Sequence, residues 1–136
     1  MIRLHCRWGR IEPRDSGDRQ LIKLIVAVKR RADVSIEQFH EHWRTAHAKL
    51  VNENPATRRY VRRYVQCHTV AAEYARGEVA FDGTAELWFD SIEDKDAFFS
   101  DPDYVRQIQP DEGRFADMAR TVGFVTEEEV VVAESL

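Results

Sequence analysis

The stretch "LIKLIVAVKRRADVSIEQFHEHWRTAHAKLV", residues 21–51, determines how the fold begins. Residues 21–30 are rich in β-branched side chains, and at the centre of the segment both alternating faces are apolar. This pattern predicts a strand that is buried on both sides. Ser35 then offers a hydroxyl that can cap a helix, which we expect to run to residues 52–54, before Pro55. The domain therefore opens with a strand and an amphipathic helix.

The rest of the chain continues the alternation of strands and helices. Residues 57–70 and 84–90 have polar and apolar side chains at period two, which predicts two strands. A second helix is expected to begin at the capping residue Ser91. A final strand is expected within residues 120–132. The order βαββαβ predicts an α+β, ferredoxin-like fold, with one antiparallel sheet and the helices on one of its faces.

Pro102 is expected to interrupt the second helix, with a further helical turn at residues 104–108. The final strand is expected to follow after Pro110 and Gly113. Residues 1–20 show no sustained period, which predicts an irregular N-terminal arm in front of a single domain at 21–136.

A ferredoxin-like sheet with helices on one face leaves its other face uncovered. An uncovered sheet face would expose a larger apolar patch than monomers normally tolerate. The topology therefore predicts a homodimer that forms through the open sheet faces.

Composition excludes several classes of partner. The 136-residue chain has a net charge of −4, which argues against a nucleic-acid partner. No segment approaches the roughly 20 apolar residues of a membrane span, so no membrane association is expected. The two cysteines form no CxxC pair, and no leader-like segment opens the sequence, which favours a cytoplasmic location.

The first helix carries three histidines that could bind a metal or transfer protons. His40 and His47 are seven residues apart, about 10 Å along a helix, and His42 points to the wet side. The segment also lacks the HExxH spacing of two histidines on one helix face. We therefore predict no metal site.

His47 is the strongest candidate for acid/base chemistry. At helical spacing it lies beside Trp43 within the apolar stripe, and an imidazole in such surroundings is partly desolvated, which lowers its pKa and keeps it neutral. A neutral imidazole can accept a proton from a substrate. The alternative is a structural histidine that is bonded to a backbone carbonyl in the core.

Two predicted strands add further candidates. Tyr64 and His68 share one face of the first strand, and Glu86 and Trp88 share one face of the next. If these faces meet and turn toward the first helix, they form an aromatic pocket with a few polar groups, as is usual for small-molecule sites. If they turn toward a partner, the same residues lie in an interface. Arg62 is expected to pair with Glu86 or to bind a substrate carboxylate.

The sequence resembles the EthD domain family over residues 21–132. The most specific element is a W-x-x-x-H-x-x-L-V run, here Trp43, His47, Leu50 and Val51. A second element, R-x-Y-V-Q-x-H, corresponds to residues 62–68, where Cys67 stands in place of an expected Asn.

The resemblance implies a dimeric α+β barrel of ferredoxin-like protomers without an organic cofactor. Similar proteins are linked to the degradation of ethers and aromatic compounds. Relatives of the barrel act as cyclases, lactone isomerases, dehydratases or decarboxylases on polyketide-like substrates, and a histidine on the first helix often serves in them. His47 is the position that matches here.

We therefore predict a cofactor-independent acid/base enzyme that acts on a hydrophobic aromatic or polyketide-like small molecule. His47 would be the general base or acid, and Tyr64 and His68 would orient or protonate the substrate. The expected substrate contacts are Trp43, His40, Arg62, Glu86 and Trp88. Cleavage of an unactivated ether is not expected from one acid/base group. The alternatives are a non-catalytic binding protein and an accessory dimer.

Overall fold

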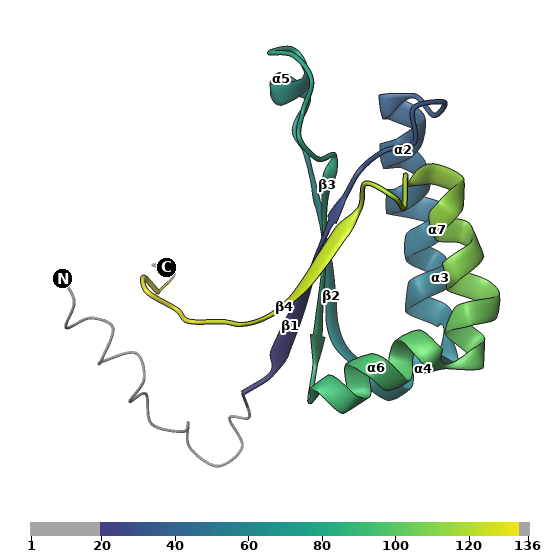
Figure 1. The fold of residues 1–136 in the computed structure, drawn as a ribbon, viewed down its shortest axis with the longest axis vertical. Coiled ribbons are helices and arrows are strands. Elements are labelled where there is room, and N and C mark those ends of the chain that lie inside the picture. Colours follow the sequence, from purple (N-terminus) through teal and green to yellow (C-terminus); the bar gives the residue numbers. More distant parts are fainter. Residues whose placement is uncertain (1–19, 134–136) are drawn as a thin grey trace.

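The computed structural model describes residues 20–133 and contains one four-stranded antiparallel sheet (Figure 1). The strands are β1 (Ile22–Val28), β2 (Val61–His68), β3 (Gly83–Phe89) and β4 (Val122–Glu127). Their order in the sheet is β2-β3-β1-β4. This order and the element sequence confirm the predicted ferredoxin-like α+β fold. The predicted N-terminal arm at 1–20 lies outside the described residues, apart from Gln20.

The first helical region consists of α2 (Ile36–His42), a π-helical turn η1 (Trp43–His47) and α3 (Ala48–Glu53). The predicted cap is present: the Ser35 hydroxyl accepts the Gln38 N–H at 3.1 Å, and the Gln38 side chain accepts the Ser35 N–H at 3.0 Å. The segments α2, η1 and α3 follow each other without a break, and α2 and η1 carry the three histidines.

A short helix that we did not predict, α4 (Pro55–Tyr60), connects this region to β2. Proline is tolerated in its first turn, and the Asn54 side chain accepts the Ala56 N–H at 2.9 Å. The expected start of the strand at residue 57 was therefore wrong. Another short helix, α5 (Ala71–Tyr74), lies in the connection between β2 and β3.

The second helical region contains α6 (Ile92–Ser100), the π-helical turn η2 (Tyr104–Ile108) and α7 (Gln109–Phe115). Ser91 caps α6 as predicted, accepting the Asp94 N–H at 3.1 Å. We did not predict α7, in which Pro110 lies in the first turn, where its missing N–H costs no hydrogen bond.

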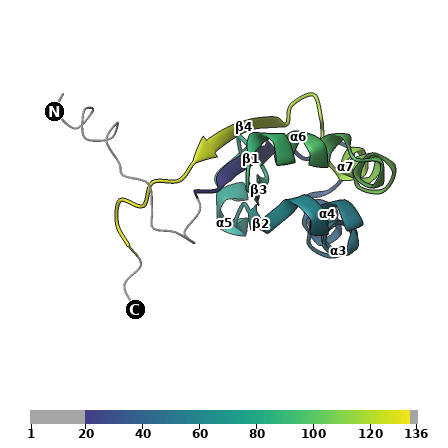
Figure 2. The same cartoon turned by 90° about the horizontal axis from the view of Figure 1, so that it is seen from below.

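Within residues 20–133, the helices of both helical regions lie on one side of the sheet, and none of them covers the other side, which we call the open face (Figures 1 and 2). Leu87 of β3 lies opposite both Leu24 and Tyr64, in the row that faces the helices. Its neighbour Glu86 lies opposite Ile25 and Val65, in a row on the open face. The buried core therefore lies between the sheet and the helices.

No helix within residues 20–133 combines the length and the apolar character that crossing a bilayer requires.

Candidate functional site

A cavity of about 270 Å³ lies between the sheet and the helices. Most of the side chains around it are apolar, and they come from the sheet and from both helical regions: Val26, Val28, Trp43, Val51, Ala85, Leu87, Phe98, Phe99, Ile108, Phe115, Ala116 and Met118. The ionisable side chains at its wall are His47, Tyr64, Tyr104 and Glu112. An apolar chamber with a few polar groups is the usual composition of a small-molecule site.

Trp43 forms part of the cavity wall, and its position depends on Gly83. The indole is 1% exposed and packs against β3 where that strand begins. A Cβ atom at position 83 would lie 2.7 Å from Trp43 Cζ3 and 2.2 Å from the Cys67 carbonyl oxygen. Only glycine therefore lets the helix approach the sheet this closely.

His47 is buried, and an acid holds its ring in place. Its Nδ1 lies 2.8 Å from Asp111 Oδ2, so the Nδ1–H donates to the carboxylate. Among residues 20–133, Nε2 has no hydrogen-bond partner, and His47 lines the cavity. Nε2 is therefore the nitrogen left for a ligand.

Asp111, on α7, is 2% exposed and binds three basic side chains. Besides His47, it contacts His42 Nε2 at 2.9 Å and an Arg114 nitrogen at 3.2 Å. The expectation that His42 points into water was wrong, because its imidazole turns to Asp111 and its side chain is one-third exposed. The carboxylate thus links the buried histidine to a histidine near the surface.

Burial and this ion pair act on the two pKa values in opposite senses. Burial raises the pKa of Asp111, but the hydrogen bonds from His42 and His47 outweigh it, and the pKa lies below its ordinary value. Burial lowers the pKa of His47 more than Asp111 raises it. His47 is therefore a neutral imidazole near pH 7, as a general base requires.

Glu112 is a second acid/base group at the cavity. Both of its carboxylate oxygens accept a hydrogen bond from the Tyr104 hydroxyl, at 2.9 and 3.0 Å. Burial raises the pKa of Glu112 to about 7, and the nearby Asp111 adds to this, while the bond from Tyr104 opposes it. A carboxyl group with such a pKa can give or take a proton at neutral pH.

We did not predict Asp111, Glu112 or Tyr104 as site residues. Asp111 is 64 residues away from His47 in the sequence, and we had predicted no helix beyond the turn at residues 104–108. The available signal was Pro110 followed by two acidic residues, which is a common start for a helix.

Tyr64 lies at the cavity, as the pocket interpretation expected. It is on β2, on the face that the helices cover, and its hydroxyl accepts a hydrogen bond from Gln66 Nε2 at 3.0 Å. Burial raises the pKa of Tyr64, and hydrogen bonding by Gln66 and Trp43 opposes the increase. The hydroxyl is therefore protonated at neutral pH.

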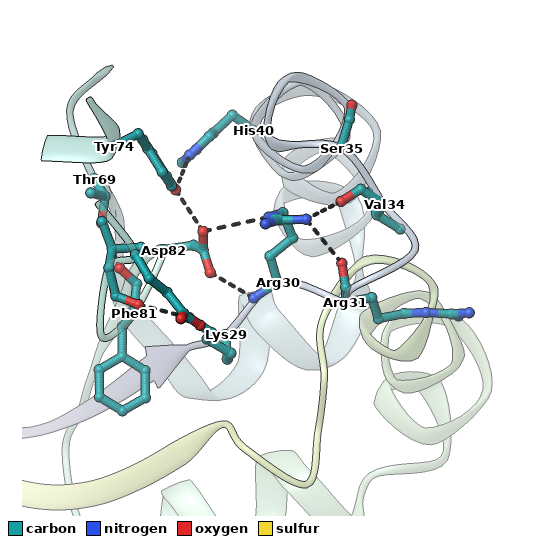
Figure 3. Close-up of polar contacts among 12 residues, drawn as sticks. Lys29, Arg30, Arg31, Val34, Ser35, His40, Thr69, Tyr74, Phe81 and Asp82 are labelled. Atoms are coloured by element: carbon teal, nitrogen blue, oxygen red, sulfur yellow. Dashed lines mark hydrogen bonds and ion pairs between the residues drawn. The ribbon is translucent and has the colours of Figure 1, made fainter. Parts of the chain in front are cut away.

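His68 and His40 do not line this cavity. Their Nδ1 atoms lie 2.7 Å apart, and His40 Nε2 lies 2.9 Å from the Tyr74 hydroxyl (Figure 3). Tyr74 in turn donates to Asp82 at 2.6 Å. Neither histidine is therefore placed to touch a molecule in the cavity, although we had expected His68 to act on the substrate and His40 to bind it.

Glu86 and Trp88 lie on the open face of the sheet, so the expectation that they meet Tyr64 and His68 was wrong. Glu86 pairs with Lys23 at 2.9 Å, and the Lys23 Nζ lies 4.5 Å from the centre of the Trp88 ring. The physical reason is the register of β2 and β3, which aligns Tyr64 with Leu87 rather than with either neighbour.

Arg62 also lies away from the cavity. Its guanidinium binds Asp90 at 2.8 Å, not Glu86, and its side chain is 45% exposed. The pairing of β2 with β3 is irregular between Val61 and Arg63, so Arg62 leaves the alternation that we had used to group it with Tyr64.

No three histidine, cysteine, aspartate or glutamate side chains within the described range 20–133 gather as ligands of one metal ion. The ionisable groups of the cavity are instead one histidine, one carboxyl group and two phenols.

These features define an α+β protein of ferredoxin-like fold in which a histidine–aspartate pair borders an apolar cavity. The family model of the EthD domain matches residues 31–119, a range that includes His47, Asp111 and Glu112. The chain therefore belongs to the EthD domain family. No curated protein sequence matches it.

Several solved structures share the fold. A protein of the ethyl tert-butyl ether degradation (EthD) family from Bacillus halodurans C-125 has a TM-score of 0.60 and 22% identity, covering 80% of this chain and 99% of its own. A dimeric ferredoxin-like protein from Bacteroides fragilis has a TM-score of 0.60 and 18% identity, and the match covers 79% of this chain and 96% of that protein. Another dimeric ferredoxin-like protein, from Thermobifida fusca, has a TM-score of 0.59 and 17% identity, covering 87% and 100%.

Proposed function

We propose that this protein is a cofactor-independent acid/base enzyme for a hydrophobic, aromatic or polyketide-like small molecule, with His47 as the general base. One observation carries the proposal. The Nδ1 of His47 is bound to a buried carboxylate, and its Nε2 is left at the wall of an apolar cavity of about 270 Å³.

The arrangement suits the removal of a proton from an activated carbon or hydroxyl. His47 Nε2 takes the proton, and the resulting imidazolium is stabilised by Asp111 at 2.8 Å. Glu112, with a pKa near 7, can return a proton elsewhere on the molecule. Such a sequence serves cyclisation, dehydration, decarboxylation or isomerisation.

The roles of the other candidates follow from their positions. Trp43 forms the wall beside His47, and Tyr64 offers a protonated hydroxyl. His40, His68, Arg62, Glu86 and Trp88 are not proposed as substrate contacts.

We also propose that the open sheet face is covered by a second copy of the chain. Beside the Lys23–Glu86 pair, this face carries an apolar patch: Ile25 lies opposite Phe124, and Phe124 and Val122 are each 53% exposed. Patches of this kind on a sheet are usually covered. Two proteins of similar fold, from Bacteroides fragilis and Thermobifida fusca, are described as dimeric.

The test of activity uses 2-tetralone, an aromatic ketone with an acidic carbon–hydrogen bond, in deuterium oxide. NMR would follow the incorporation of deuterium next to the carbonyl, together with binding of the ketone. The wild type should bind it and catalyse the exchange. His47→Gln should bind it but exchange about 10²–10⁴-fold more slowly. Lys49→Ala, on the exposed side of α3, should behave as the wild type.

Two results would contradict the proposal. Binding without exchange in the wild type would identify a binding protein instead. Absence of binding would assign His47 a structural role in the core.

A further inference from the structure

A chain of hydrogen bonds leads from the cavity to His40 on α2. At the cavity, Gln66 Nε2 lies 3.0 Å from the Tyr64 hydroxyl and 2.8 Å from the Trp43 carbonyl oxygen. A carbonyl oxygen only accepts hydrogen bonds, so the nitrogen of the Gln66 amide must lie on this side. The amide oxygen then faces His68 Nε2, at 2.8 Å.

The orientation of the Gln66 amide determines the tautomers of His68 and His40. Its amide oxygen only accepts, so His68 Nε2 carries a hydrogen and donates it. Burial, with His40 adding to it, lowers the pKa of His68 to about 4, so the ring is neutral and its Nδ1 is bare. Since His40 Nδ1 lies 2.7 Å from this bare nitrogen, His40 Nδ1 is the donor.

Beyond His40 lie Tyr74 and Asp82, whose carboxylate is buried, with 1% of the residue exposed. The carboxylate accepts the Tyr74 hydroxyl at 2.6 Å and the backbone N–H of Arg30 at 2.8 Å (Figure 3). Tyr74 lies 2.9 Å from His40 Nε2.

The Tyr74 hydroxyl donates its only hydrogen to Asp82. Burial lowers the pKa of His40, so its ring is neutral, and with its hydrogen on Nδ1 its Nε2 is bare. No hydrogen therefore lies between His40 Nε2 and the Tyr74 oxygen. The directed hydrogen bonds run from His40 through His68 and Gln66 to Tyr64.

The direction of these bonds determines what Tyr64 can do. Its oxygen accepts from Gln66, and no acceptor for its own hydrogen exists among residues 20–133. The side chain lines the same cavity as His47. The hydrogen of Tyr64 is therefore left for a molecule inside the cavity.

We propose that Gln66, His68 and His40 are positioning residues that hold Tyr64 as a hydrogen-bond donor to an oxygen of the bound molecule. This inference rests on the proposed function and narrows its substrate class to hydrophobic molecules that carry a carbonyl group. When His47 removes the neighbouring proton, the electron pair of the broken C–H bond moves onto the carbonyl oxygen. Tyr64 then donates to the oxygen that gains the charge.

The decisive variant is Gln66→Glu, which keeps the shape of the side chain. A carboxyl group in place of the amide cannot donate to both Tyr64 and the Trp43 carbonyl, so the Tyr64 hydrogen turns to residue 66. Tyr64→Phe removes the donor altogether. Cys67→Ser is the matched control, because Cys67 is the next residue of β2 and is exposed on the opposite face.

The measurement is the carbonyl stretching frequency of 2-tetralone, labelled with ¹³C at the carbonyl, in infrared spectra of its complexes. A hydrogen bond from Tyr64 lowers this frequency in the wild type and in Cys67→Ser. Gln66→Glu and Tyr64→Phe should both lose this shift while the ketone still binds. Equal frequencies in the wild type and Tyr64→Phe would overturn the inference.

The direction of the hydrogen bonds between Gln66, His68 and His40 is tested separately, in the protein without a bound ketone. Long-range ¹⁵N–¹H NMR spectra should show His68 with a protonated Nε2 and a bare Nδ1. The opposite tautomer would overturn the inference whether or not the ketone binds. Failure of 2-tetralone to bind would instead contradict the proposed function, and the tautomer would still decide this inference.

Discussion

Asp111 Oδ2 lies 2.8 Å from Nδ1 of His47, and both side chains are buried. The contact fixes the tautomer of His47 and leaves Nε2 at the cavity. It also makes the proton affinity of the imidazole depend on a residue that is 64 positions away in the sequence.

Replacing Asp111 with Asn should lower the pKa of His47. The carboxylate stabilises the imidazolium, and without its charge nothing opposes the lowering of the pKa of His47 by burial and by His42. We expect a decrease, because the ring loses an adjacent opposite charge. An NMR titration of the histidine ring protons measures it. Asp96→Asn, an exposed change on α6, is the control; an unchanged His47 titration in Asp111→Asn would contradict the prediction.

The stability of Glu112→Gln relative to the wild type should be greater at pH 8 than at pH 4. The folded-state pKa of Glu112 is raised from 4.5 to about 7, so the wild type loses stability as the pH rises through this interval, whereas the amide does not titrate. The gap between the two pKa values corresponds to a change of at most about 3 kcal/mol in the free energy of unfolding.

Urea unfolding of the wild type and Glu112→Gln at both pH values measures this difference. Effects of all other groups cancel in the comparison, provided that they titrate equally in both proteins. A stability difference that does not change between pH 4 and pH 8 would show that Glu112 is not desolvated.

Gly83→Ala should destabilise the fold by about 1–3 kcal/mol, the usual cost of overpacking. The added Cβ would meet the Cys67 carbonyl at 2.2 Å and Trp43 at 2.7 Å, and the backbone of β2 cannot yield without losing its pairing. Gly113→Ala in α7 is the matched control, because a Cβ there meets nothing within 4 Å. It should be neutral or stabilising by up to about 1 kcal/mol. Thermal unfolding of both variants checks the pair, and equal melting temperatures would contradict the proposed packing.

Phe124→Glu should convert a dimer to a monomer. Phe124 lies in the row of the open sheet face that also holds Ile25, and a charge in an apolar interface would be desolvated without a partner. Sedimentation velocity measures the outcome. Val105→Glu changes an exposed apolar residue on the helical side and should leave the dimer intact. A wild type that sediments as a monomer would refute the dimer proposal.

The periodicity of single elements was a reliable guide to this fold. The alternation in β1, β2 and β3 and the capping residues Ser35 and Ser91 led to the correct order of elements, because these signals are local. The position of His47 in an apolar helix stripe likewise predicted its burial, because helix geometry alone determines that face.

What could not be predicted depends on contacts between distant segments. The register of β2 against β3 decides that Tyr64 shares its face with Leu87 and not with Glu86, and a local irregularity near Arg62 shifts that register. Asp111 reaches His47 only because the helical region continues through Pro110. No local pattern contains this information.

The most direct test of His47 as the base is the pH dependence of kcat/KM for deuterium exchange into 2-tetralone. We predict that the rate rises with pH through a midpoint below 6.5, because burial lowers the pKa of His47 and only the neutral ring accepts a proton. This rise should be absent in His47→Gln. A flat profile in the wild type, or a rise that persists in His47→Gln, would contradict the account.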